Sequence, residues 1–252
     1  MLGPGLPDWP TSAAVLREAR AYERARTQLP LPEALPPAER RRAGRIIRLA
    51  LAIGTEAVAQ AGRDARALPS VFSSSGGDGE NCHAICVALA EPERLISPTR
   101  FHNSVNNAAA GYWSIAQGCT EASLTLCAFD ASFGAGLIEA LAQVAQTRQP
   151  VLLLAYDADY PPPLGAHRPI PDAFGVALLL APADSARALA RVRVSLCHEP
   201  ACRLARAELE ALRASIPAAR ALPLLERVAR SRPGRSIIDY LDDTRLAVEL
   251  AT

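Results

Sequence analysis

The stretch "LTLCAFDASFGAG", from Leu124 to Gly136, has the form of an apolar strand that passes through a sharp turn into a helix. This arrangement presents a side chain at a helix N-terminus, where unpaired N–H groups and the helix dipole favour negative charge. A cysteine on such a turn would be held as a thiolate and could accept an acyl group from a thioester. The residue on this turn, however, is Asp130.

An aspartate is a poor substitute for that nucleophile. A carboxylate at a helix N-terminus is acidified, and its acylation would give a mixed anhydride, which lies uphill from a thioester. Aspartate is also among the preferred N-cap residues, so we predict that Asp130 caps the following helix rather than attacking a substrate. Cys127 is predicted to lie within the strand and to pack in the core.

The composition restricts the class of protein. The chain has 252 residues, of which 50% are hydrophobic and 21% charged, with a net charge of +1. That length predicts a single domain over 1–252. Near-neutral charge argues against a nucleic-acid partner, and no apolar run is long enough for membrane insertion. Six cysteines do not make a disulfide scaffold in a chain of this length, so we expect a cytoplasmic protein with reduced thiols.

Strands alternate with helices on both sides of the opening stretch. Proline-rich residues 1–37 precede this alternation, with one short helix over 12–25, and a hairpin over 235–250 ends it, turning at Asp242–Asp243. The pattern predicts an α/β fold whose sheet is mixed, because the late strands have no helices between them. The strands are predicted over 69–77, 123–129, 150–156, 174–181 and 190–196. The other helices are predicted over 37–62, 81–90, 104–117, 131–146, 207–215 and 222–230, with Gly62 and Gly118 as C-terminal stops and 97–103 as a loop.

Two long strings carry a resemblance to a known family. The string "SPTRFHNSVNNAAAGYWSIAQG" followed by "SLTLCAFDASFGAGLIEA" resembles the short β-ketoacyl-synthase-like proteins of bacterial aryl polyene and xanthomonadin-type pigment clusters, described as ketosynthase chain length factors. The resemblance covers nearly the whole chain, including "VFSSSGGDGENCHAIC" and "RPIPDAFGVALLLAP". It implies half of a thiolase-like fold, the N-terminal half of a ketosynthase.

The resemblance also implies an inactive subunit. Against ordinary ketosynthases the segment from Ser97 to Phe133 aligns without a gap, which places Asp130 where the ketosynthase cysteine stands. The two ketosynthase histidines belong to the second half of that fold, which has no counterpart here. Relatives also begin with a short strand before "GPGLPDW", and they read "SVHNA" where this chain carries Asn106.

By this resemblance the chain would be a non-catalytic chain-length-factor-like subunit. It would pair with a full-length ketosynthase to elongate an aryl polyene chain carried on the phosphopantetheine of an acyl carrier protein, with no cofactor of its own. In ketosynthase dimers the strand before the nucleophile pairs across the twofold axis, and its edge would otherwise stay unpaired. Here that strand comprises Ser123, Leu124, Thr125, Leu126 and Cys127.

The same resemblance points to residues that could wall the partner's acyl tunnel. Residues Thr99, Arg100, Phe101 and His102 belong to a loop that reaches toward the partner in ketosynthases. Four further aromatic candidates could close the tunnel end or could equally be ordinary core residues: Tyr112, Trp113, Phe129 and Phe133.

Other patterns leave alternatives. The clusters "CHAIC" and "CHEPAC" lack a regular C-x-x-C pair, so no metal site is expected. The basic run Arg40–Arg48 could attract an acidic carrier protein, although a solvated helix face is the commoner explanation. Two rival functions are an independent acyltransferase or hydrolase that uses Asp130 or a cysteine, and a scaffold that stabilises a ketosynthase without touching the acyl chain.

Overall fold

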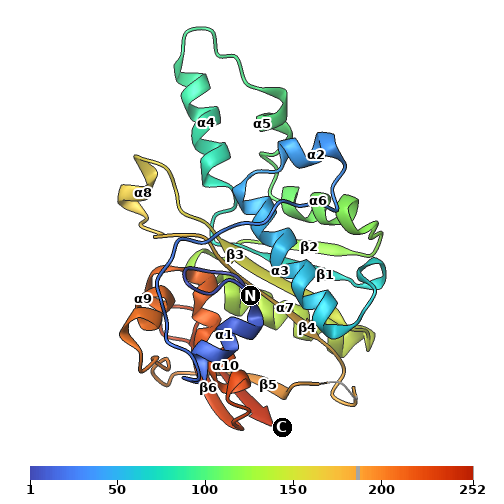
Figure 1. Cartoon of the computed structure of the whole chain (residues 1–252), viewed down its shortest axis with the longest axis vertical. Helices are drawn as coiled ribbons and strands as arrows, with labels where there is room; N and C mark the ends of the chain where they lie inside the picture. The colour runs from blue at the N-terminus through green and yellow to red at the C-terminus, as the bar shows by residue number, and fades with distance from the viewer. Residues whose placement is uncertain (186–187, 252) are drawn as a thin grey trace.

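The computed structural model describes residues 1–185 and 188–251 and contains a mixed sheet with helices on both faces (Figure 1). The four strands of this sheet follow the order β2-β1-β3-β4. They are β1 (Ser70–Ser73), β2 (Ser123–Leu126), β3 (Val151–Asp157) and β4 (Phe174–Leu180). Strands β2 and β3 run parallel to β1, whereas β4 runs antiparallel to β3. The predicted mixed sheet is confirmed.

A second, antiparallel sheet lies toward the C-terminal end of the molecule (Figure 1). Its strands follow the order β5-β7-β6 and comprise β5 (Arg191–Cys197), β6 (Gly234–Asp239) and β7 (Arg245–Ala251). Strands β6 and β7 form the hairpin expected over 235–250, with Asp242 and Asp243 in the connection.

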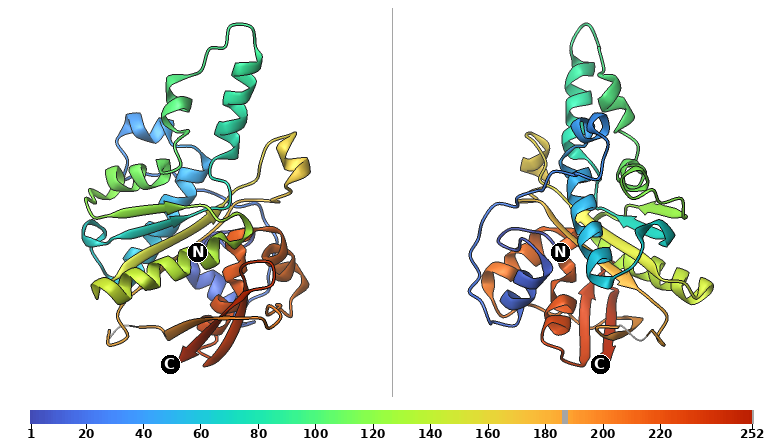
Figure 2. Two further views of the ribbon diagram at one scale, coloured as in Figure 1. Left: turned by 180° about the vertical axis from the view of Figure 1, so that it is seen from behind. Right: turned by 45° about the vertical axis from the view of Figure 1, so that its right-hand side comes forward.

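Strand β3 divides the hydrophobic core into two halves. All of its residues are buried, and alternate side chains point to opposite faces of the sheet. Its odd-numbered residues 151–155 pack with α7 (Ser132–Thr147), and its even-numbered residues 152–156 pack with α3 (Arg45–Ala61) and α6 (Ala108–Gln117). Figure 2 shows α3 and α7 on opposite sides of the sheet. Burial on both faces is why this strand is a continuous apolar run.

The helix predicted over 37–62 is two helices. Helix α2 (Pro37–Arg42) ends before Gly44, which is extended, and α3 begins at Arg45. The Asn103 amide donates a hydrogen bond to the Arg42 carbonyl (2.9 Å), and Arg45 forms an ion pair with Asp172 (2.7 Å). These contacts from distant segments fix the break. The end of α3 agrees with the sequence, because Gly62 adopts the left-handed conformation.

The N-terminal helix is also shorter than predicted. Helix α1 (Trp9–Leu16) is followed by an extended segment rather than by further helix up to residue 25. Thr27 fixes that segment to the start of β4, since its backbone N–H donates to Asp172 (2.8 Å) and its hydroxyl to the Ala173 carbonyl (2.7 Å). Leu2 forms a β-bridge with Gly175 of β4.

Two helices project from the body of the molecule as an arm, residues 79–102 (Figures 1 and 2). They are α4 (Gly79–Ala90) and α5 (Pro98–His102), and α5 occupies the segment predicted to be a loop. The remaining helices are α8 (Leu164–His167), α9 (Ala207–Ser215), α10 (Leu222–Ala229) and the short 3₁₀ turns η1 (Ala65–Ala67), η2 (Phe129–Ala131) and η3 (Pro217–Ala221).

Candidate functional site

The turn after β2 keeps the shape that the sequence suggests. Strand β2 ends at Leu126, the 3₁₀ turn η2 follows, and α7 begins at Ser132. Phe129, on this turn, has a positive φ of 50°, which is rare for a bulky side chain. The buried Ser132 hydroxyl bridges the turn: it donates to the Phe129 carbonyl (2.7 Å) and accepts from the Ala128 N–H (2.9 Å).

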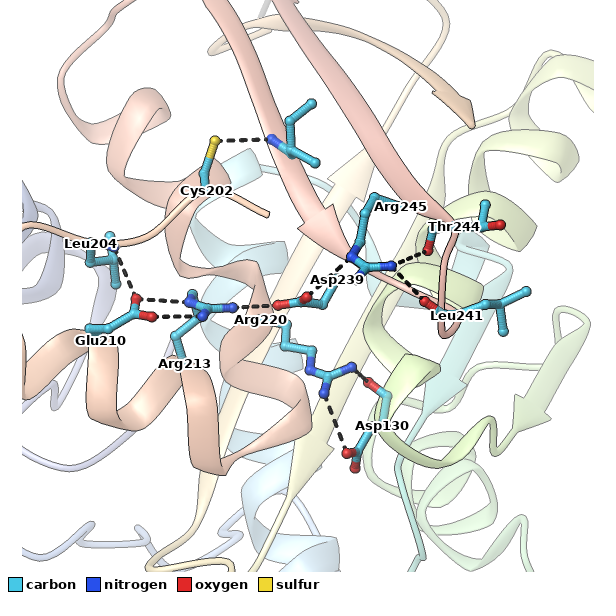
Figure 3. A network of polar contacts seen from close by, with 11 residues as sticks. Asp130, Cys202, Leu204, Glu210, Arg213, Arg220, Asp239, Leu241, Thr244 and Arg245 are labelled. Atoms are coloured by element: carbon cyan, nitrogen blue, oxygen red, sulfur yellow. Dashed lines mark hydrogen bonds and ion pairs between the residues drawn. The ribbon is translucent and has the colours of Figure 1, made fainter. Parts of the chain in front are cut away.

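Asp130 does not cap α7, contrary to the prediction. The N-cap residue is Ala131, and no side chain accepts from the first turn. One carboxylate oxygen of Asp130 instead accepts from Arg168 (2.7 Å) and the other from Arg220 (3.3 Å). Arg220 also donates to the Asp130 backbone carbonyl (2.6 Å; Figure 3). Two guanidinium groups, which make strong charge-assisted hydrogen bonds, thus hold the carboxylate in place of the backbone N–H groups.

This arrangement is unsuited to covalent catalysis. The carboxylate of Asp130 is engaged by two cations, and arginine cannot act as a general base because it does not lose its proton in proteins. Figure 3 shows Arg220 next to a second group of ion pairs, in which Arg213 and Arg245 both contact Asp239 at the end of β6. The turn is therefore built into a charged framework that joins η2 and η3 and lies beside the C-terminal hairpin.

Neither nearby thiol replaces the missing nucleophile. Cys127 lies just after β2 and is exposed, so its predicted place in the strand and core is wrong. Its thiol donates to the side-chain oxygen of Asn106 (3.3 Å), and desolvation together with Asp157 raises the pKa of this thiol. Cys119 is buried and donates to the Leu68 carbonyl (3.7 Å). Neither contact supplies a base.

The aromatic candidates divide into two groups. Tyr112, Trp113 and Phe133 are at most 2% exposed and lie in the core of this chain, which agrees with the alternative that they are ordinary core residues. Phe101 and Phe129 are 68% and 64% exposed. Phe101 lies on α5 with Thr99, Arg100 and His102, and none of these four residues is buried. The surface expected to meet a partner is therefore α5 and the turn at Phe129.

Strand β2 has an unpaired edge. Among the described residues it lies at the end of the sheet and pairs with β1 alone. The carbonyls of Ala122 and Leu126 accept from Ser70 and Ser74, at 3.0 and 3.3 Å. Because backbone groups along a strand alternate in direction, the N–H and C=O groups of Ser123 and Thr125 point away from β1. An exposed row of this kind is a template for pairing with another chain.

The arm carries apolar side chains that nothing in the described residues covers. Along α4 only Gly79 and Asn81 are buried, and α5 has no buried residue. Apolar side chains that are 47–79% exposed follow one another through the arm and the segment after it: Val87, Leu89, Leu95, Phe101 and Val105. Such a run of exposed apolar residues is typical of a surface that a protein partner covers.

A groove rich in arginine lies between the start of α3 and the base of the arm. Its volume is about 570 Å³, and its lining includes Arg41, Arg48 and Arg100 together with Asp78 and Glu80. These three arginines make no ion pair within residues 1–185 and 188–251, and the buried Nε of Arg48 has no hydrogen-bond partner there. The basic run is thus one wall of a groove, not only a solvated helix face.

Asp157 joins the elements beneath the turn. It ends β3, is 2% exposed, and accepts from the backbone N–H groups of Ser75 (2.8 Å) and Ala218 (2.8 Å). Burial raises the pKa of this carboxyl from its ordinary value of 3.8 to about 6, against the opposing effect of these hydrogen bonds.

A pH dependence of folding follows from Asp157. The folded chain holds the proton more tightly than the unfolded chain, so stability should fall as the pH rises from about 4 to about 6 and then level off. The shift corresponds to at most about 3 kcal/mol in the free energy of unfolding. In urea titrations at several pH values, Asp157→Asn should lack this decline. Equal declines in both proteins would contradict the assignment.

Two further kinds of feature are absent from the described part of the chain. Among those residues no three His, Cys, Asp or Glu side chains come together in a way that could hold a metal ion. No helix there is both long and apolar enough to cross a bilayer.

Comparison with known proteins now identifies the family. Residues 15–230 match the family model described as β-ketoacyl synthase, N-terminal domain. The chain belongs to this β-ketoacyl synthase family. Comparison with curated proteins gives no match.

Solved ketosynthase structures share the fold. A chain in the complex of the ketosynthase ApeO with its chain length factor ApeC from Xenorhabdus doucetiae is 23% identical, with a TM-score of 0.67 over 98% of this chain and 95% of that one. A chain of the ishigamide ketosynthase/chain length factor is 16% identical, with a TM-score of 0.69 over 99% and 96%. A β-ketoacyl synthase from Burkholderia phymatum, 18% identical with a TM-score of 0.52, matches 66% of this chain over only 46% of its own length. The predicted thiolase-like ketosynthase fold is confirmed.

Sequence reasoning missed the arginine partners of the turn. Arg168 follows α8 and Arg220 lies on η3, 38 and 90 residues from Asp130. No spacing rule links such positions. The one available signal is the string "RPIPDAFG", which begins at Arg168 and is among the strings that resemble the chain length factors.

Proposed function

We propose that this chain is a non-catalytic, chain-length-factor-like subunit that pairs with a full-length β-ketoacyl carrier-protein synthase in the cytoplasm. The observation that carries the proposal is Asp130: at the position aligned with the ketosynthase cysteine stands a carboxylate held by two arginines. Such a group neither accepts an acyl chain nor activates another residue, so the catalytic cysteine and histidines must come from a partner.

Three observations support a ketosynthase as that partner. The edge of β2 offers outward N–H and C=O groups, and the arm exposes apolar side chains. Two of the solved structures that share this fold are described as a ketosynthase with a chain length factor. In this proposal β2 pairs with the corresponding strand of the ketosynthase, and the arm covers part of its surface.

The substrate would reach this complex on an acyl carrier protein. We place the carrier at the arginine groove, because Arg41, Arg48 and Arg100 line it and form no ion pair with any other described residue. Charge complementarity of this kind steers an acidic protein to its docking site. The phosphopantetheine would belong to the carrier, so the chain needs no cofactor of its own. The acyl chain is proposed to be an aryl polyene, from the sequence resemblance alone.

Control of chain length is the finer part of the proposal. With Tyr112, Trp113 and Phe133 buried in the core, the residues left to shape the partner's tunnel are Phe101, Phe129 and the α5 residues Thr99, Arg100 and His102. A pure scaffold would leave product length unchanged when Phe101 is shortened, whereas a length factor would not.

Co-expression tests the proposal. The chain is produced alone and together with a full-length ketosynthase from the same organism, and both samples are run on a size-exclusion column. We expect the two proteins to elute together and the mixture to condense acyl groups, while the chain alone gains no acyl mass from an acyl thioester. A chain that ignores the ketosynthase, or that is acylated by itself at one residue, would refute the proposal.

A further inference from the structure

Phe129 is an exposed aromatic ring on a backbone conformation that aromatic residues rarely adopt. Its side chain is 64% exposed and its φ is 50°. Exposure of the ring and a positive φ both work against the stability of the isolated chain. Residues of this kind persist where their surroundings fix them, and they gather at functional sites. The exposed ring and the positive φ of Phe129 therefore point to a role in binding another molecule.

The ring is held rigidly in spite of its exposure. The guanidinium carbon of Arg168 lies 3.8 Å from the ring centroid, in cation–π contact with one face. The Asp130 carboxylate accepts a 2.7 Å hydrogen bond from Arg168. Arg220 donates to the carboxylate and to the backbone carbonyl of the same Asp130. The Phe129 carbonyl is fixed in turn by the Ser132 hydroxyl. The 3₁₀ turn η2 is thus held by hydrogen bonds to its backbone carbonyls and by the contact between Arg168 and the Phe129 ring.

We propose that Phe129 is an aromatic anchor that inserts into an apolar pocket of the ketosynthase partner, with Asp130, Arg168 and Arg220 as its positioning residues. This inference rests on the proposed function. The turn begins three residues after the unpaired strand β2, so one short segment of the chain leads from the edge that a partner would pair with to the ring. Rigid aromatic side chains backed by arginine are the residue types that dominate binding at the centres of interfaces.

The contacts of Asp130 with Arg168 and Arg220 give a structural role to the position that aligns with the ketosynthase cysteine. A ring that is already fixed loses little conformational freedom on binding, so more of the contact free energy remains as affinity. In a ketosynthase the same turn must present sulfur at its tip. Here the ion pairs of Asp130 hold the turn so that the preceding residue, Phe129, is presented instead.

Affinity for the ketosynthase measures the role of the ring. Phe129→Ala should weaken the complex by about 30-fold or more, chiefly through faster dissociation. Phe129→Tyr, which keeps the ring, should bind within about threefold of the unmodified chain. Asp130→Asn leaves the ring in place but removes the charge that holds Arg168, and it should give an intermediate loss. Dissociation rates are measured by surface plasmon resonance, with the purified ketosynthase immobilised and each variant of this chain in solution.

Two controls separate anchoring from folding. Phe129→Gly tolerates the positive φ, so the isolated variant should melt at a higher temperature than Phe129→Ala while binding equally weakly. Leu196→Ala alters a side chain that is 66% exposed on the other sheet, and it should leave binding unchanged. If the unmodified chain binds and Phe129→Ala binds as tightly, the anchor is refuted and the proposed function stands. If the unmodified chain does not bind at all, both are refuted.

Discussion

Replacing Trp113 with alanine is expected to lower the free energy of unfolding by about 3–5 kcal/mol, the usual cost of removing a buried large aromatic side chain. Trp113 is 1% exposed and lies between α3 and β3. The packing is tight, because a Cβ on Gly54 would lie only 2.6 Å from its ring and 2.8 Å from Leu154. The surroundings therefore have little room to collapse into the cavity. Urea denaturation followed by far-ultraviolet circular dichroism measures the change.

Phe101→Ala is the matched control for this measurement. The resemblance makes Phe101 a candidate for the wall of the partner's tunnel, but Phe101 is 68% exposed, so its loss should change the free energy of unfolding of the isolated chain by no more than about 0.5 kcal/mol. Similar destabilisation by both substitutions would mean that the division of these aromatics into core and surface is wrong.

The sequence predicted best those elements that local rules determine. Strand β3 is an unbroken apolar run, and Gly62 and Gly118 end helices in the left-handed conformation that glycine tolerates. The C-terminal hairpin follows from two apolar strands and an acidic turn. Each of these features depends on residues within a few positions of one another, and each is confirmed.

The errors share one cause, which is contact between distant segments. The run 37–62 has a helical pattern throughout, but Asn103 and Asp172 hold it open around Gly44. Asp130 has the ideal chemistry for an N-cap, but two arginines compete for its carboxylate. Propensity is a weak prior that such tertiary contacts override.

Only the part of the candidate site that depends on local sequence was predictable. Its central substitution, an acid on the nucleophile turn, is visible in the sequence alone. Which aromatic residues face outward is not, because Phe129 and Phe133 are separated by one helical turn yet are 64% and 1% exposed. That difference arises from the 3₁₀ turn and the positive φ before α7, which no periodicity reveals.

Thr125→Pro should abolish pairing with the ketosynthase while leaving the isolated chain folded. The N–H of Thr125 points away from β1, so its removal costs no hydrogen bond within the sheet, and proline is tolerated on an edge strand in that orientation. In the complex the same change leaves a partner carbonyl without a donor and places the proline ring against the incoming strand. We expect binding to weaken roughly 100-fold or more, measured by co-elution and by titration of the purified proteins.

Two control variants, one at the same position and one at the adjacent residue, show whether the effect comes from the outer edge of β2. Thr125→Val keeps the backbone N–H and nearly the same shape. The Thr125 hydroxyl is buried and has no hydrogen-bond partner in the part of the chain that the structure describes, so neither stability nor binding should fall. Leu124→Pro removes an N–H that points toward β1, and it should lower the melting temperature of the isolated chain instead. If Thr125→Pro bound the ketosynthase as well as Thr125→Val does, β2 could not be the strand that joins the two proteins, and the interface would have to lie on the arm and the turn at Phe129.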